Sequence, residues 1–494
     1  MGTFFQTQER ESCFQLQLMK EIGYDVVSFG NHEFDFSTHF LLQMLNKVSK
    51  EKMPLLTLSN IESDLKNNSD DDFQNLFDKN IINKYVILKR GGLKIGIFGL
   101  LGKDAYAVCP DIKPLKFVDN ISTAKSIVKI LKNVEKVDFV ICLSHCGVQK
   151  NKKNEWVGED VELAKKVQGI NLIVGGHTHT KLSEPIFVND IPIVQTGCFG
   201  ENIGRMELNI KNNKILSSKY QLIKVDDKIQ GNLEIQNKID EQIDKINENI
   251  LNKLELDYHK VFAVSNFDLI CEENNLQNSN LGPFLSDAVY YYINNFSQRK
   301  TDVSLIAYGV IRNNISKGNI SASDIFKTVG LGSGFDNVPG YPLVQVFVTA
   351  KDLKDFYEFI LIACEKENIA HCYFTNIDFV VDNSKRKLHK VQKIKIGDLF
   401  VDFSGKNEKL YSVSCDLLML KMISQVKKLS HGFLKPQVRD EKGNIITDFS
   451  KVIIDFDNNT DGIQEGKEWI AVVKYLLSFD KENGISAVPN KYQK

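Results

Sequence analysis

The chain has 494 residues, of which 43% are hydrophobic and 25% charged, and its formal net charge at pH 7 is −1. At about 100–200 residues per domain, this length predicts roughly two to four domains rather than one core. The balanced charge gives no electrostatic reason to expect a nucleic-acid partner. No apolar run in the sequence reaches the roughly 18–20 residues that a membrane-spanning helix needs.

The first residues, MGTFFQTQERESCF, contain no basic segment followed by an apolar one, so they do not predict a signal peptide. Gly2 would suit N-myristoylation, but Gln6 stands where a Ser or Thr is wanted. The nine cysteines are scattered and none forms a CxxC pair, which favours buried, reduced thiols. This is consistent with a reducing compartment, or with a secreted protein that does not depend on disulfides.

The first half of the chain repeats a short apolar run followed by a polar or glycine corner. Most runs are continuously apolar, which is typical of strands covered on both faces. Helical patterns lie between several of them, at Cys13–Ile22, Ala124–Val134 and Val161–Val167. We therefore expect an α/β domain over residues 1–225. The predicted strands are Asp25–Phe29, Leu55–Ser59, Lys94–Leu100, Val137–Leu143, Asn171–Val174 and Pro192–Gln195.

A helix and a second α/β domain follow. Over residues 226–258, isoleucines and leucines recur at steps of three and four, which predicts an amphipathic linker helix; a coiled-coil seam is the alternative. Residues 259–494 again alternate helical and strand-like segments. The predicted helices are Leu281–Tyr292, one starting near Ser323, one ending at Phe359, and Trp469–Phe479; the predicted strands are Asp302–Ala307, Leu343–Val348, those within Phe379–Ile396, and Tyr411–Cys415.

Three predicted strands of the first domain end in polar corners. The first is SFGNHEFD, with Asn31, His32 and Asp35. The second is VDFVICLSHCG, which delivers His145, and the third is INLIVGGHTHT, with the histidines at 177 and 179. Ligands of open α/β sheets bind beyond the carboxyl ends of the strands, so we expect these groups to lie at one edge.

The residue types at this edge favour metal chemistry. Neutral imidazole is a common metal ligand, and an Asn side chain can add a carbonyl oxygen. His177 and His179 are one residue apart, so in an extended segment both can face one site. His32 follows Asn31 directly and would point elsewhere, and Asp35 can hold its tautomer. Single corners of this kind are often simple turns, but three together predict a shared metal site. The remaining histidines, at 39, 259, 371, 389 and 431, are interpreted as structural or surface residues.

GNHEFD, SH and GGHTHT together resemble the motifs of calcineurin-like metallophosphoesterases. More narrowly, the chain resembles the bacterial 5′-nucleotidase and UDP-sugar hydrolase family, in a layered metallophosphoesterase sandwich joined to a second α/β substrate-binding domain. VQTGCFGENIGRMEL is similar to the strand that closes the family's first domain. NSNLGPFLSDAV and DVSLIAYGVIRNNISKGNISASDIF are similar to its C-terminal domain, so the likeness covers nearly the whole chain.

The resemblance implies two divalent metal ions, which could be Mn, Zn, Fe or Co. Asn31, His145 and His177 would bind one ion and His179 the other. His32, backed by Asp35, would stabilise the transition state and protonate the leaving oxygen. The substrate would be a 5′-nucleotide, hydrolysed to a nucleoside and phosphate, in a compartment outside the cytoplasmic membrane. A cyclic phosphodiesterase or a nucleotide-sugar pyrophosphatase would use the same metals.

The sequence departs from the family at its start. The family opens with a strand ending in Asp-x-His and a second ending in Gly-Asp, which supply most ligands of the first metal and the bridging carboxylate. Neither motif occurs here, and MGTFFQTQE resembles the segment that follows the second. We therefore expect that the first two strands are missing. Either Met1 is an internal methionine of a longer, active enzyme, which retention of every later ligand favours, or the chain is a non-catalytic nucleotide- or partner-binding remnant.

The predicted substrate residues lie in the second domain. Arg312 matches the family's substrate-binding arginine, and its guanidinium suits phosphate or carboxylate groups. The Asn-Gly-Gly-Gly expected before it reads Ala307–Val310. Asn280 belongs to the NSNLG match, and Phe433, in SHGF, is the candidate for stacking on a nucleobase. A surface role for Phe433 is the alternative, and oligomeric state is not readable from the sequence.

Overall fold

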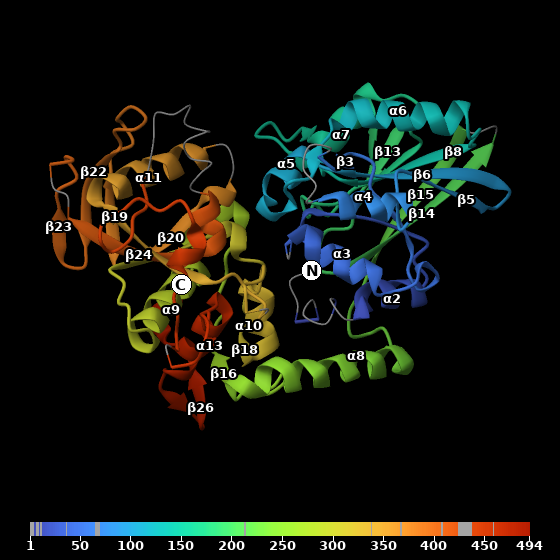
Figure 1. The fold of residues 1–494 in the computed structure, drawn as a ribbon. Helices are drawn as coiled ribbons and strands as arrows, with labels where there is room; N and C mark the ends of the chain where they lie inside the picture. Colours follow the sequence, from blue (N-terminus) through green and yellow to red (C-terminus); the bar gives the residue numbers. More distant parts are fainter. Residues whose placement is uncertain are drawn as a thin grey trace. The chain divides into compact units, whose positions relative to one another are not determined.

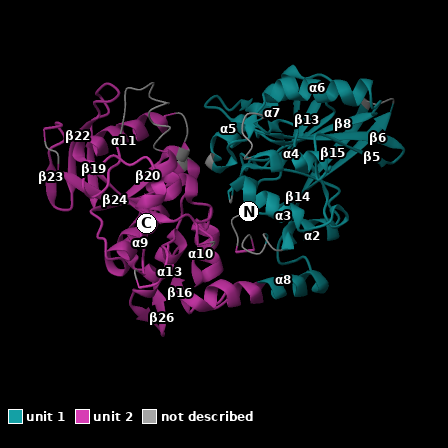
Figure 2. Ribbon diagram, in the orientation of Figure 1, with its two compact units in different colours: residues 1, 8–242 teal, residues 2–7, 243–494 magenta. Residues whose placement is uncertain are grey.

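The computed structural model describes residues 4–5, 9, 12–35, 37–64, 70–211, 214–336, 338–365, 368–406, 409–422, 437–457 and 459–494. The chain divides into two compact units, residues 1 and 8–242 and residues 2–7 and 243–494 (Figure 2). The division falls inside helix α8 (Leu233–Ile246), so the predicted linker helix contributes to both units. The predicted domain limits at 225 and 258 stay predictions.

The first unit is built on a six-stranded sheet in the order β12-β13-β11-β8-β6-β5 (Figure 1). The four inner strands run parallel, and β5 and β12 run antiparallel at the edges. The strands are β5 (Val86–Arg90), β6 (Leu93–Leu101), β8 (Phe139–His145), β11 (Leu172–Val174), β12 (Ile186–Val188) and β13 (Ile191–Val194).

Both faces of this sheet are covered, which explains its continuously apolar strands. Alternate residues of a strand point to opposite faces. Val140 and Cys142 pack against helices α6 (Asn120–Asn133) and α7 (Glu159–Lys166). Phe139 and its neighbours on the other face pack against a long hairpin formed by β14 (Asn202–Lys211) and β15 (Lys214–Lys224).

A second, three-stranded parallel sheet in the order β1-β2-β4 carries the first polar corner. A Cβ on Gly99 of β6 would lie 2.3 Å from Ser28 Oγ and 2.5 Å from the Thr57 carbonyl oxygen, so only glycine allows the two sheets to approach here. This approach brings the ends of β1 and β8 together. The elements are β1 (Val26–Ser28), β2 (Leu55–Thr57), β4 (Ile82–Asn83), α2 (Phe14–Glu21), α3 (Ser37–Asn46) and α4 (Asp71–Asp78).

The second unit contains a four-stranded sheet in the order β19-β24-β17-β20. One face packs against α11, and α9 with α13 covers the other (Figure 1). Smaller sheets, β18-β16-β26-β25 and β21-β22-β23, complete the unit. The main elements are α9 (Leu281–Phe296), β17 (Val303–Ala307), β19 (Leu343–Thr349), α11 (Ala350–Ala363), β20 (Cys372–Thr375), β24 (Leu410–Asp416) and α13 (Glu468–Leu477).

Shorter elements connect these layers. In the first unit they are β3 (Ile61–Glu62), α5 (Lys103–Ala107), β7 (Lys116–Phe117), β9 (Gln149–Lys150) and β10 (Trp156–Val157). In the second unit they are β16 (Val261–Ser265), β18 (Gly318–Ser321), α10 (Ala322–Val329), β21 (Ile377–Val381), β22 (Val391–Ile396), β23 (Leu399–Val401), β25 (Lys481–Glu482) and β26 (Ile485–Ala487).

The predicted two-domain α/β class is confirmed, and each predicted strand of the first half overlaps an observed strand. The predicted helix is observed, but its geometry changes along its length: α8 ends at Ile246, and a π-helical turn (Asn247–Leu251) and a 3-10 turn (Asn252–Leu254) continue it. Within the part of the chain that the structure describes, no helix combines the length and the apolar character needed to cross a bilayer.

Candidate metal centre

The first corner begins directly after β1. Gly30 leads into a single 3-10 turn, Asn31–Phe34, and the Glu33 side chain accepts a hydrogen bond from the Gly30 N–H at 2.5 Å. The Cys109 thiol donates to the Asn31 carbonyl oxygen at 3.1 Å. Asn31 is buried, at 6% exposure, so its side-chain amide is held in a fixed place.

The second corner meets the first through His145, the last residue of β8. Its Nε2 lies 2.9 Å from Asn31 Oδ1, a hydrogen bond between residues 114 positions apart. Burial chiefly, and then the neighbouring imidazoles of His177, His32 and His179, lowers the pKa of His145 to about 3. The ring is therefore neutral at pH 7 and keeps a nitrogen lone pair, as a metal ligand must.

Gly30 is required for this contact. A Cβ at this position would lie between 2.6 and 2.9 Å from three atoms of the His145 ring, closer than non-bonded carbon atoms approach. The φ of Gly30 is −107°, so the reason for glycine is space and not backbone conformation. The glycine of the GNHE motif thus admits the histidine of the second corner.

The third corner follows β11 and turns sharply. His177 and His179 have φ angles of +70° and +55°, in the left-handed region that side chains other than Gly, Asn and Asp rarely adopt. Such conformations cluster at functional sites. The rings of His145 and His177 lie 5.2 Å apart between centroids, whereas the exposed His179 meets the edge of Phe199 at 5.9 Å. Three of the four predicted ligands, Asn31, His145 and His177, thus lie close together, and the exposed His179 acts electrostatically on His145.

His32 and Asp35 form the predicted pair. His32 Nδ1 lies 2.8 Å from Asp35 Oδ2, and the side chains are 23% and 11% exposed. Because the carboxylate accepts a hydrogen bond from Nδ1, it fixes the tautomer and leaves Nε2 for another partner. His32 also acts electrostatically on His145, which places it beside the metal-ligand candidates.

Asp160 supports the second corner and was missed by sequence reasoning. It is fully buried in the first turn of α7 and accepts hydrogen bonds from Ser144 Oγ and from the Gly147 N–H, the latter at 3.1 Å. Burial raises its pKa to about 6. Acidic residues are common in the first turn of a helix, so the sequence gives no signal that separates Asp160 from a capping residue.

The predicted substrate residues belong to the second unit. Asn280, at 7% exposure, accepts from the Ile270 N–H at 2.6 Å and donates to the Asp268 and Tyr492 carbonyl oxygens at 2.9 Å. These bonds assign it an anchoring role and give its predicted substrate contact no support. Half-buried Arg312 lies near Tyr308, and its N–H donates to the Thr328 carbonyl oxygen. Phe433 lies outside the described residues.

Comparison with known proteins agrees with these motifs. Residues 2–181 match the calcineurin-like phosphoesterase family, and residues 258–409 match the 5′-nucleotidase C-terminal domain. The chain thus combines a calcineurin-like phosphoesterase domain with a 5′-nucleotidase C-terminal domain. A calcineurin-like phosphoesterase domain implies divalent metal ions as cofactors.

Relatives and solved structures show the same combination. The chain is 25% identical to the trifunctional nucleotide phosphoesterase protein YfkN of Bacillus subtilis, over 77% of this chain and 26% of that protein. It is 24% identical to the 5′-nucleotidase of Vibrio parahaemolyticus, over 78% of this chain and 69% of that protein. The fold matches a 5′-nucleotidase precursor from Thermus thermophilus with a TM-score of 0.71 and 19% identity, over 99% of this chain and 88% of that one. The chain therefore spans about a quarter of the Bacillus relative.

The donor set fits a divalent transition metal in type, but it is small. Neutral imidazoles and an amide oxygen suit Mn, Zn, Fe or Co. The carboxylates of Glu33, Asp35 and Asp160 are already hydrogen-bonded to neighbouring protein groups. Among the described residues, no three His, Cys, Asp or Glu side chains converge closely enough to hold an ion by themselves. The amide oxygen of Asn31, 2.9 Å from His145 Nε2, is a further donor that these corners offer.

Proposed function

We propose that the chain hydrolyses phosphate esters, most directly 5′-nucleotides to nucleosides and phosphate, in nucleotide catabolism. The observation that carries this proposal is the 2.9 Å approach of His145 Nε2 to Asn31 Oδ1, with His177 and His32 beside them. Separate strands contribute these groups, so their meeting is a property of the fold. The names of the Bacillus and Vibrio relatives support nucleotides as the substrate class.

The corners would hold two divalent ions. Asn31, His145 and His177 would contribute to one ion and His179 to the other. Bound ions would polarise the phosphoryl oxygens and lower the pKa of a water molecule toward 7. The lowered pKa of His145 supports this role, because the residue offers a lone pair without first losing a proton.

His32 would act on the substrate itself. Asp35 holds Nδ1, so Nε2 can donate a hydrogen bond to a phosphoryl oxygen and a proton to the leaving oxygen. With 23% of its side chain exposed, His32 remains accessible to a ligand.

The test compares two histidine variants of the full chain in a nucleotide panel with added Mn²⁺, Zn²⁺, Fe²⁺ or Co²⁺. His32→Ala should lower phosphate release by about 10²–10⁴-fold, the usual contribution of a general acid, while metal content changes little. His39→Ala is the matched control, because His39 is exposed and bonded only to Gln43 among described residues. Unchanged turnover in His32→Ala would remove this residue from the mechanism.

A second candidate function is nucleotide binding without hydrolysis. It is favoured by the small donor set, in which no three ionisable ligands converge among the described side chains. Equilibrium dialysis with a labelled nucleotide, run beside the phosphate assay, separates the two. Binding without phosphate release under every metal would support the second candidate, and release would support the first.

We place the reaction outside the cytoplasmic membrane, at the cell surface or in the periplasm. The family resemblance supports this location. Protease treatment of intact cells that produce the untagged full-length protein tests it, because an external protein is degraded while a cytoplasmic marker survives.

A further inference from the structure

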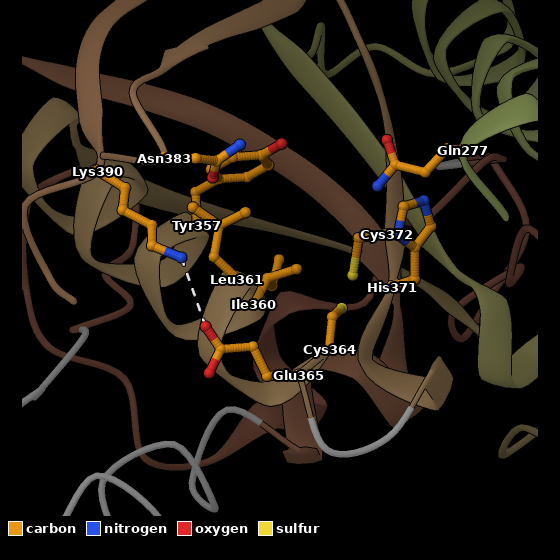
Figure 3. Close-up of a pocket in the computed structure, with 10 residues that line it drawn as sticks. All are labelled: Gln277, Tyr357, Ile360, Leu361, Cys364, Glu365, His371, Cys372, Asn383 and Lys390. Atoms are coloured by element: carbon orange, nitrogen blue, oxygen red, sulfur yellow. Dashed lines mark hydrogen bonds and ion pairs between the residues drawn. The ribbon is translucent and has the colours of Figure 1, made fainter. Parts of the chain in front are cut away.

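A cavity of about 260 Å³ lies in the second unit, and no residue of the metal corners lines it (Figure 3). Its volume is just below the roughly 300–1,000 Å³ of pockets that take drug-sized ligands. Helix α11, the start of β20, the loop between β21 and β22 and the turn of Gln277 all contribute to its wall. Segments from four parts of the sequence thus enclose one small space.

The cavity has two polar ends and an apolar centre. Figure 3 shows Lys390 and Glu365 at one end and Gln277 and His371 at the other. The rest of the wall consists of Asn383, which lies beside Tyr357 in Figure 3, and of apolar side chains and two thiols: Tyr357, Ile360, Leu361, Cys364 and Cys372. One face of the Tyr357 ring is already stacked on Phe379, with centroids 3.8 Å apart and the planes at 6°. This stack holds the wall rigid.

Lys390 is the under-satisfied group. Its side chain is only 15% exposed, and among the described residues its ammonium has one partner, Glu365 Oε1 at 3.4 Å. That distance exceeds the 2.7–3.2 Å of a good N–H···O bond. An ammonium has three donors, and a half-buried cation without strong acceptors favours an added anion.

Glu365 does not cancel this charge. Its other oxygen is bound by Lys387, whose side chain is 60% exposed and lies outside the cavity lining. Lys387 and Lys390 together therefore carry one more charge than Glu365. An anion on Lys390 would leave the Glu365–Lys387 pair intact.

The far end is neutral. Burial lowers the pKa of His371, so the imidazole is uncharged at pH 7. Its carbonyl oxygen accepts from the Tyr308 N–H at 2.8 Å, which fixes the backbone of this wall. Neutral His371 and the amide of Gln277 can each donate or accept a hydrogen bond. A hydroxyl or carbonyl group, rather than a second charge, matches them.

We propose that this cavity binds a small carboxylate with a planar, ring-sized body and a neutral polar group opposite the carboxylate. The carboxylate pairs with Lys390, the ring lies along Tyr357 and the two thiols, and the polar group meets His371 and Gln277. The site is separate from the metal centre and does not depend on hydrolysis. The chain would therefore bind a second small molecule in addition to its substrate.

The first test uses 4-hydroxybenzoate as the probe and 4-hydroxybenzamide as its uncharged analogue, both titrated calorimetrically into the full chain. For a ligand of this size, the chain should bind the acid with a dissociation constant on the order of 1 mM. It should bind the amide at least ten times more weakly. Lys390→Gln should weaken binding of the acid about tenfold, whereas Lys387→Gln should leave it unchanged. No binding of the acid at 10 mM (about ten times the expected dissociation constant), or equal effects of the two substitutions, would overturn the proposal.

The second test locates the probe. Cys364 is half-buried and lines the cavity, so bound 4-hydroxybenzoate should slow its alkylation by iodoacetamide several-fold. Peptide mapping by mass spectrometry reads each thiol separately. Half-buried Cys198, in the first unit, is the internal control and should react at an unchanged rate. Slowing of both thiols, or of neither, would place the probe elsewhere.

Discussion

The two units place their chemistry in different ways. In the first unit, the predicted residues Asn31, His145 and His177 follow or end strands of two sheets and meet where those sheets approach each other. In the second unit, Asn280 precedes a helix and Arg312 follows a short turn, and the structure gives Asn280 an anchoring role. In both units we predicted site residues from motifs at the ends of helices and strands. In the first unit the side chains meet, whereas in the second unit Asn280 is bonded to backbone groups.

The difference lies in what fixes each side chain. Parallel strands carry their carboxyl ends to one edge, so a polar residue there has its position decided by sheet topology. A polar residue at a helix start faces a competing use, because orphan backbone groups need partners there. In this chain Asn280 makes no side-chain cap bond to α9 and instead bonds three backbone groups of other segments, those of Ile270, Asp268 and Tyr492.

The largest effect should come from closing the space between the two corners. Gly30→Ala places a methyl group against the His145 ring, where the approach would be 2.6 Å. The ring must move, and a displacement of about 1 Å can cost 10²-fold in rate. We expect phosphate release to fall by about that factor and bound metal to fall with it.

Gly231→Ala is the matched control for this substitution. A Cβ on Gly231 would meet no atom within 4 Å, and its φ is not in the left-handed region. Equal losses in the two variants would show that helix or loop propensity, and not the contact with His145, explains the effect. Full activity in Gly30→Ala would show that phosphate release does not depend on the close contact between the first and second corners.

The anchoring role of Asn280 gives the second prediction. Asn280→Ala leaves the Ile270 N–H and the Asp268 and Tyr492 carbonyl oxygens without their partner. Only the bond to Tyr492 is fully buried; at about 1–3 kcal/mol for a buried unsatisfied group, the free energy of unfolding should fall by roughly 1–3 kcal/mol. Urea unfolding followed through Trp469 fluorescence, in a Trp156→Phe background, reports on the second unit.

Exposed Asn278 is the control for Asn280, because its side chain bonds only Asn275 among described residues. Asn278→Ala should change stability by less than about 0.5 kcal/mol. Unchanged stability of Asn280→Ala, together with a raised KM for nucleotide, would contradict the anchoring role and support the predicted substrate contact.

A third prediction concerns pH and the second unit alone. Asp416 and Glu468 are buried side by side; burial raises the pKa of Asp416 to about 6, and burial together with the Asp416 carboxyl raises the pKa of Glu468 well above its usual value. The folded state therefore binds more protons than the unfolded state above pH 4, so stability falls as pH rises through 6. Glu468→Gln should flatten this slope and stabilise the unit at pH 8 by about 1–3 kcal/mol. The measurement is the free energy of unfolding against pH, followed through Trp469 fluorescence. A steeper fall with pH in the variant would contradict the proposed interaction between Asp416 and Glu468.

The smallest effect should come from Arg312. Arg312→Lys keeps the charge but loses the planar fork that binds a phosphate or carboxylate in two places. We expect KM for nucleotide to rise about tenfold, the equivalent of 1.4 kcal/mol, with kcat nearly unchanged. Arg299→Lys, an exposed arginine in the same unit, should have no effect. A fall in kcat with unchanged KM would show that Arg312 acts on the reaction and not on binding.

Sequence patterns predicted the fold class, the strands of the first half and the three polar corners. They could do so because apolar runs report buried strands and the polar residues stand where those strands end. The pattern could not show that Gly30 is needed for space, that Asp160 holds Ser144, or that α8 ends at Ile246. Each of these features depends on which distant segment of the chain packs beside it. A single sequence does not show which segments pack together.

The central claim is that the three corners share a divalent ion, and direct Mn²⁺ binding to the full chain tests it. Calorimetric titration of the wild type should show binding that His145→Ala and His177→Ala each weaken at least tenfold, while His39→Ala binds as the wild type does. Equal Mn²⁺ affinity in all four proteins, or none in the wild type, would contradict the account.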